Sequence, residues 1–228
     1  MTEATIHLPT QNHTATVIWL HGAGDCGESW LLLSNELSAK FPHVKWIFPN
    51  APLRPLTCYD GAEMPAWFDI VSFVSEKAHA ETDTASMKAS VARVNTLIEN
   101  EIKSGIPVQR IILGGFSQGC VISLLTTILT THDLGGTIGC SGFIPSQKHV
   151  SVLGQPIKKD TPLLVLHGDK DIVVPVQYGR IAVHQLEKMG YNIAFYEYPG
   201  LAHSFEEEQL LQVAKFLKEH IPTLSAKL

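Results

Sequence analysis

The chain has 228 residues, of which 45% are hydrophobic and 17% are charged, and its formal net charge is −5. This size and composition indicate a globular protein with a sizeable core, and the absence of a basic cluster argues against nucleic acid as a partner. No run reaches the roughly 18 apolar residues that a transmembrane segment needs, and residues 1–9 lack the pattern of a signal peptide.

Four cysteines are widely spaced in the sequence and form no C-x-x-C pair: Cys26, Cys58, Cys120 and Cys140. In a chain of this size the spacing is typical of free thiols in a reducing compartment, so we expect a cytoplasmic protein. No H-E-x-x-H motif or comparable ligand cluster is present, and we therefore expect neither a metal ion nor another cofactor.

Short apolar runs and amphipathic segments alternate along the chain. Strands are expected at residues 4–8, 15–20, 44–48, 111–113, 136–140, 162–167 and 192–198, and helices at 29–40, 86–103, 118–129, 176–189 and 205–220. Residues 15–20 are apolar almost throughout, as expected when both faces of a parallel sheet are covered. The alternation predicts one doubly wound α/β domain over residues 1–228, with helices on both faces of a mostly parallel sheet.

Three stretches are expected to lack regular structure. Residues 49–57 contain three prolines, and residues 146–161 are polar and loop-like. Residues 56–86 predict an irregular cover that faces the substrate, because long loops in compact domains tend to be functional. The alternative is a surface excursion that packs its aromatic side chains for its own stability.

One serine lies in the sequence Gly115-Phe-Ser-Gln-Gly119, between the strand at 111–113 and the helix at 118–129. This strand–turn–helix context indicates a nucleophile elbow, and its two glycines leave room for the turn. Ser117 is therefore the predicted nucleophile. A serine hydroxyl is a weak nucleophile at neutral pH, so it requires a base and an acid that orients the base.

Loops after two later strands carry the candidate partners. His203 lies between the last strand and the last helix and is the predicted base, whereas His167 ends a strand and is expected to be structural. Asp171 is the predicted acid. Asp169 is the alternative, expected to support the loop through hydrogen bonds to backbone amides. The resulting order Ser…Asp…His is that of α/β-hydrolases.

An oxyanion hole needs two backbone N–H groups near the nucleophile. The first is expected from Gln118, the residue after Ser117. The second is expected from Ala23, in the loop His21-Gly-Ala-Gly24 that follows the strand at 15–20.

Seven motifs, in this order, resemble the acyl-protein thioesterase/carboxylesterase family of α/β-hydrolases. They are Leu20-His-Gly-Ala-Gly-Asp25, Pro49-Asn-Ala-Pro52 with Arg54-Pro55, Trp67-Phe-Asp69, Gly114-Gly-Phe-Ser-Gln-Gly119, Ser141-Gly-Phe-Ile-Pro145, His167-Gly-Asp-Lys-Asp171 and Gly200-Leu-Ala-His203. The resemblance spans nearly the whole chain.

The resemblance implies the same triad and oxyanion donors, and the hydrolysis of thioesters on S-acylated proteins, of carboxylic esters or of lysophospholipids. The acyl chain would lie in an apolar groove. Two features depart from the family: Ala23 stands where a leucine is frequent, and residues 71–86 do not follow the pattern closely.

Apolar residues of the cover are candidates for this groove, together with one residue from the loop after the strand at 136–140. They are Leu56, Met64, Trp67, Phe68, Ile70, Phe73 and Phe143. Residues of the cover would equally serve as local core. If they are exposed, they would contact a lipid chain or a second copy of the chain in a weak homodimer.

The leading hypothesis is a serine hydrolase that cleaves acyl thioesters or esters through an acyl-enzyme. A general carboxylesterase acting on short-chain esters is the rival, because the same triad serves both. A non-catalytic binding protein on a hydrolase scaffold is a third hypothesis. It predicts the loss of a triad member, whereas all three candidates are present.

Overall fold

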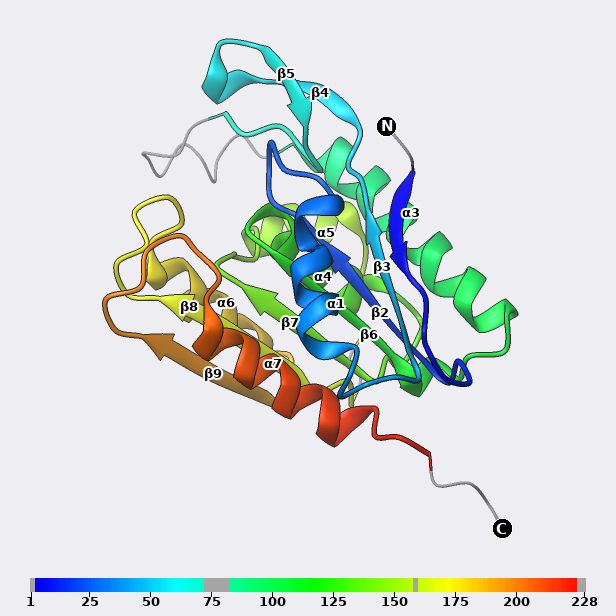
Figure 1. The fold of residues 1–228 in the computed structure, drawn as a ribbon. Helices are drawn as coiled ribbons and strands as arrows, with labels where there is room; N and C mark the ends of the chain where they lie inside the picture. Colours follow the sequence, from blue (N-terminus) through cyan, green and yellow to red (C-terminus); the bar gives the residue numbers. More distant parts are fainter. Residues whose placement is uncertain (1–2, 72–82, 158–159, 225–228) are drawn as a thin grey trace.

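The computed structural model describes residues 3–71, 83–157 and 160–224 (Figure 1). A seven-stranded sheet has the order β1-β3-β2-β6-β7-β8-β9. Its strands are β1 (Ala4–His7), β2 (Ala15–Leu20), β3 (Val44–Pro49), β6 (Ile111–Phe116), β7 (Gly136–Cys140), β8 (Leu163–Gly168) and β9 (Ile193–Tyr198). Only β1, at one edge, runs antiparallel to its neighbour. The predicted α/β class with a mostly parallel sheet is confirmed.

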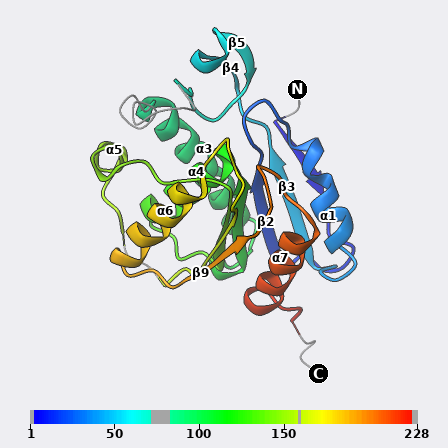
Figure 2. The same cartoon turned by 90° about the vertical axis from the view of Figure 1, so that its left-hand side faces the viewer.

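Helices cover both faces of the sheet, as Figure 2 shows. One face carries α1 (Leu31–Leu37) and α7 (Glu207–His220). The other carries α3 (Thr84–Lys103), α4 (Gln118–Leu129), α5 (Gln147–Leu153) and α6 (Val176–Lys188). Two short 3₁₀ segments, Glu28–Trp30 and Val108–Arg110, precede α1 and β6.

The apolar run of β2 is explained by this two-sided cover. Successive side chains of a strand point to opposite faces. Ile18 and Leu20 therefore lie in the core beneath α3 and α4, whereas Val17 and Trp19 lie in the core beneath α1 and α7. Every residue of the strand is buried.

A two-stranded hairpin corrects the expectation for residues 49–57. It consists of β4 (Leu53–Leu56) and β5 (Ala62–Pro65), joined through the 3₁₀ turn Thr57–Tyr59. Pro55 lies opposite Glu63, and a proline is tolerated there because both strands of an isolated hairpin are edge strands. The predicted irregular cover at 56–86 therefore contains regular structure in its first third, and residues 72–82 lie outside the described ranges.

A second correction concerns α5, which lies in the stretch 146–161 that we expected to be a loop. The helix has seven residues and buries only Val150 and Leu153, which pack on the larger core. Two buried side chains in a polar segment give too weak a periodic signal for prediction. Among the described residues, no helix is long and apolar enough to cross a membrane.

Candidate active site

Ser117 lies at a sharp turn between β6 and α4, at the carboxyl end of the sheet. Its backbone has φ 55° and ψ −117°, a conformation that residues other than glycine rarely adopt. Its N–H donates to the carbonyl of Cys140 at the end of the neighbouring strand β7 (2.9 Å). The surrounding structure therefore holds Ser117 in a strained backbone conformation, and such conformations are frequent at functional sites.

The glycines on either side of Ser117 are required for steric reasons. A Cβ atom on Gly119 would overlap the backbone carbonyl of Leu20, and one on Gly115 would lie 2.5 Å from the carbonyl carbon of Gly119. Real Cβ atoms do not approach backbone atoms this closely. The two glycines therefore let α4 begin directly against β2 and β6.

Asp171 and His203 meet across two loops, one after β8 and the other after β9. His203 Nδ1 lies 2.7 Å from Asp171 Oδ2, and the His203 ring packs against Phe116, with the ring centroids 4.7 Å apart. An ionised carboxylate only accepts hydrogen bonds, so Nδ1 must carry the proton. In the neutral ring, Nε2 is then free to accept a proton. This is the tautomer that a general base for a serine needs.

The Asp171 carboxylate is held ionised although it is buried. Its Oδ1 accepts the N–H groups of Val173 (2.9 Å) and Val174 (2.8 Å). Burial acts to raise the pKa of Asp171, but hydrogen bonds from His167, from His203 and from the Val174 N–H outweigh it. They hold this pKa well below its usual value.

Asp169, the alternative acid, has a different role. Its Oδ1 accepts the N–H of Gly200 (2.7 Å), while its own N–H donates to Tyr198 O (3.0 Å). These bonds connect the loop after β8 to the loop after β9. The geometry thus favours Asp171 as the acid, with Asp169 supporting the two loops through backbone groups.

The loop after β2 brings Ala23 beside the nucleophile. A Cβ on Gly22 would lie 3.3 Å from Ser117 Cβ, so the loop passes directly against that side chain. Among the described residues, the N–H groups of Ala23 and Gln118 meet no hydrogen-bond acceptor. Two donors without partners beside the serine are what an oxyanion hole requires.

The buried ring of His21 orients this loop. Its Nε2 accepts the N–H of Ala51 (3.0 Å), so Nδ1 carries the proton and donates to Gly22 O (2.6 Å). Burial lowers the pKa of His21 and so favours the neutral ring. Gly22 O and the Ala23 N–H belong to one trans peptide and point in opposite directions. Holding the oxygen therefore directs the N–H away from the ring.

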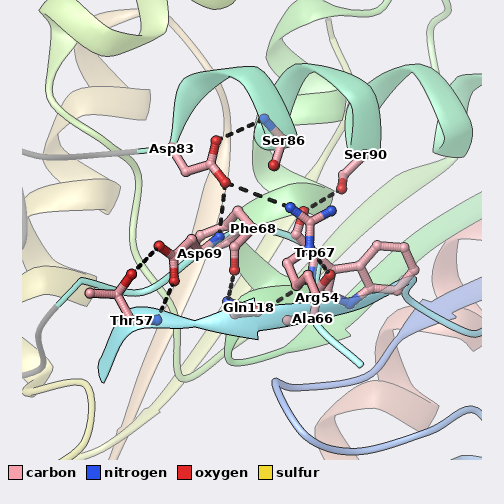
Figure 3. A network of polar contacts seen from close by, with 10 residues as sticks. All are labelled: Arg54, Thr57, Ala66, Trp67, Phe68, Asp69, Asp83, Ser86, Ser90 and Gln118. Atoms are coloured by element: carbon pink, nitrogen blue, oxygen red, sulfur yellow. Dashed lines mark hydrogen bonds and ion pairs between the residues drawn. The ribbon is translucent and has the colours of Figure 1, made fainter. Parts of the chain in front are cut away.

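Gln118 connects the elbow to the cover through its side chain, as Figure 3 shows. Its Oε1 accepts the N–H of Trp67 (2.8 Å), and its Nε2 donates to Phe68 O (2.7 Å). Trp67 makes two further bonds: its indole N–H donates to His21 O (2.8 Å), and its carbonyl accepts from Ser90 Oγ on α3 (2.6 Å). The cover is thus bonded to both loops that carry the expected oxyanion donors.

Asp83 anchors the far end of the described cover (Figure 3). Its Oδ1 accepts the N–H of Ser86 at the start of α3 (3.0 Å), which makes it the N-cap of that helix. Its Oδ2 accepts the N–H of Asp69 (3.1 Å) and lies 3.6 Å from Arg54 Nη1. Asp69 in turn accepts both the N–H and the hydroxyl of Thr57.

We expect Gln118→Met to lower the free energy of unfolding by about 2 kcal/mol, because it leaves the buried N–H of Trp67 and the carbonyl of Phe68 without partners. Methionine has a similar shape and keeps the backbone N–H. Denaturant titration measures the effect. Ser90→Ala, which removes one neighbouring bond, should cost about half as much; an unchanged midpoint for Gln118→Met would show that the side chain is not an anchor.

The candidate groove residues divide by burial. Leu56, Trp67 and Phe68 are buried in the described structure, whereas Met64, Ile70 and Phe143 are half-buried. Ile70 and Phe143 pack against the larger core. Phe73 lies outside the described residues. The assignment of this set to an acyl groove stays a prediction.

Two histidines contribute contacts that sequence reasoning did not assign. His21 orients the loop of Ala23, and His167, which we expected to be structural, has its Nε2 3.5 Å from Asp171 Oδ2. The available signal was position alone: His21 directly follows β2 and His167 lies near the end of β8, and the loop after each strand carries a candidate site residue.

Taken together, a mostly parallel sheet, a strained serine after one of its central strands, and an Asp–His pair at the same edge define a serine hydrolase of the α/β-hydrolase class. The sequence profile of the phospholipase/carboxylesterase family matches residues 1–221. The chain belongs to this family, and it is a serine hydrolase of carboxylic esters.

Individual relatives agree with this placement. The chain is 38% identical over 215 residues to acyl-protein thioesterase 1 of Yarrowia lipolytica, covering 92% of this chain and 93% of that protein. It is 39% identical over 210 residues to acyl-protein thioesterase 1 of Schizosaccharomyces pombe, covering 91% and 92%.

Solved structures give the same result. Arabidopsis thaliana SOBER1 superposes with a TM-score of 0.84 at 30% identity, covering 91% of this chain and 99% of that one. Zea mays acyl-protein thioesterase 2 superposes with a TM-score of 0.76 at 30% identity, covering 95% and 98%.

Proposed function

We propose that Ser117, His203 and Asp171 are the catalytic triad of a thioesterase for S-acylated proteins that also cleaves lipid-like acyl esters. The backbone N–H groups of Ala23 and Gln118 form its oxyanion hole. The observation that carries the proposal is the strained turn at Ser117, which lies at the same sheet edge as the 2.7 Å contact between His203 and Asp171.

The geometry supports a two-step reaction. Ser117 Oγ attacks the acyl carbonyl carbon while His203 Nε2 takes the hydroxyl proton, and the Asp171 carboxylate stabilises the imidazolium that forms. The negative oxygen of the tetrahedral intermediate accepts hydrogen bonds from the backbone N–H groups of Ala23 and Gln118. His203 then protonates the leaving thiolate or alkoxide, and a water molecule, activated by the same imidazole, releases the acyl group from Ser117.

The substrate class rests on relatives rather than on a bound ligand. The curated relatives at 37–39% identity are named acyl-protein thioesterases, and they match over most of their length. The same chemistry would serve a carboxylesterase, since the triad acts on the carbonyl and not on the chain attached to it. Acyl-chain length therefore distinguishes the two functions.

We expect kcat/KM to rise with acyl length from butyryl to palmitoyl in a series of S-acylated peptides and matched oxygen esters. Each methylene that enters an apolar groove contributes about 0.8 kcal/mol, or roughly fourfold, until the groove is full. A rate that stops rising at butyryl would identify a short-chain carboxylesterase instead. Keeping the peptide constant in the series isolates the contribution of the acyl chain.

We also propose that the protein works in the reducing cytoplasm. All four cysteines are free, and Cys120 and Cys140 are buried. Burial raises the pKa of both buried thiols, so they remain protonated and unreactive. Free thiols of this kind need no oxidising compartment.

A further inference from the structure

His167 lies fully buried near the end of β8 and contacts both ends of the turn that carries Asp171. Its Nε2 is 2.7 Å from Val174 O and 3.5 Å from Asp171 Oδ2. A carbonyl oxygen can only accept, so the hydrogen of the ring must be on Nε2. A single N–H thus faces the first and the last residue of the turn 171–174.

The opposite side of the ring faces Gly179 in α6. Nδ1 is buried and has no hydrogen-bond partner among the described residues, and a Cβ on Gly179 would lie 2.5 Å from it. Glycine inside a helix is less favourable than alanine, so its presence here has a packing reason. A proton on Nδ1 would find no acceptor. The contacts therefore place the ring hydrogen on Nε2, where it points to Asp171 and Val174.

We propose that His167 is a positioning residue for the triad acid: its Nε2–H closes the turn 171–174 and holds the Asp171 carboxylate toward His203. The inference rests on the assignment of Asp171 to the triad. Its physical basis is that Asp171 Oδ2 faces two imidazole N–H groups. The contact with His203 Nδ1 is 2.7 Å and the contact with His167 Nε2 is 3.5 Å.

The second donor also moderates the charge on the carboxylate. Without it, the Asp171 carboxylate would interact more strongly with the positive charge that develops on the His203 ring, so the pH dependence of turnover should change. Other charged groups on neighbouring elements pair with one another at the surface: Lys170 with Asp169 (3.3 Å) and Arg180 on α6 with Glu197 on β9.

A pair of variants in the full-length protein tests the proposal. Gln places an N–H where His167 has Nε2, whereas Met has similar length and no donor. We expect His167→Met to lower kcat about tenfold with little change in KM, and to move the acid limb of the kcat/KM profile to higher pH. His167→Gln should stay within about threefold of the wild type on both measures.

Gly179→Ala gives an independent perturbation, because the added methyl group displaces the His167 ring without removing it. Its kcat and acid limb should change in the same direction as in His167→Met, although alanine favours the helix. It also tests the proposal if His167→Met does not fold.

Two outcomes would overturn the proposal. If the folded His167→Met and Gly179→Ala variants lose thermal stability but keep the wild-type kcat and acid limb, His167 is only structural. Asp171→Asn, assayed in parallel, separates the triad assignment of Asp171 from the positioning role of His167. Wild-type turnover in Asp171→Asn would refute the triad assignment itself. A large loss of turnover in Asp171→Asn would confine the failure to the role of His167.

Discussion

Ser117→Ala is expected to lower kcat by about 10⁴-fold or more while the protein stays folded, since alanine removes only the attacking oxygen. Neither the turn nor its N–H bond to Cys140 O involves the hydroxyl. Turnover of an acyl thioester measures the loss. A fluorophosphonate probe that labels active serines should modify the wild type at Ser117, as located by peptide mapping, and should not modify the variant.

Ser141 provides a matched control. It directly follows the neighbouring strand β7, has a similar positive φ of 52°, and its buried hydroxyl has no hydrogen-bond partner among the described residues. Ser141→Ala should keep turnover within a few-fold and retain the label. Probe labelling that survives Ser117→Ala would refute the nucleophile assignment, and an unlabelled wild type would favour a non-catalytic protein on this scaffold.

Asp171→Asn should reduce kcat by about 10⁴-fold. The amide can turn its NH₂ toward His203 Nδ1, which places the ring hydrogen on Nε2 and leaves no base for Ser117. The neutral amide also cannot stabilise the imidazolium. Hydrogen bonds overcome burial and keep the pKa of Asp171 well below its usual value, so this carboxylate stays ionised in the wild type in mild acid. The lower kcat of Asp171→Asn relative to the wild type should therefore persist there.

Asp169→Asn is the paired control, because an asparagine Oδ1 can still accept the Gly200 N–H. We expect its turnover to stay within about tenfold of the wild type. The reverse result, with Asp169→Asn inactive and Asp171→Asn active, would show that the acid was assigned to the wrong aspartate.

Hydrogen bonds join the cover to the two loops of the proposed oxyanion hole. Gly24 N–H donates to Pro65 O (2.8 Å) and the Trp67 indole to His21 O, so the hairpin side of the cover fixes the loop of Ala23. Gln118, the residue expected to supply the other N–H group, holds the cover by accepting the Trp67 N–H with its side chain. Sequence changes at residues 65–68 should therefore affect turnover.

Much of the fold could be predicted because its signals are local. A parallel strand covered on both faces must be apolar at successive positions, and β2, β6 and β8 show this in their own residues. The elbow at Ser117 requires small residues two positions away on each side, and that requirement is also local. Since parallel strands end at one edge, loop residues after several strands could be expected to converge there.

The sequence by itself thus determined the α/β class, the family resemblance and the candidate set for the triad. It also predicted Asp171 as the acid rather than Asp169, and the tertiary structure adds the contact that favours this choice, a carboxylate that reaches a ring 32 residues away. Only the tertiary structure decided the contacts of His167, the proline-containing hairpin and α5. Each depends on contacts between residues that are not neighbours in the chain or on a segment too short to show periodicity, and such contacts leave no local pattern.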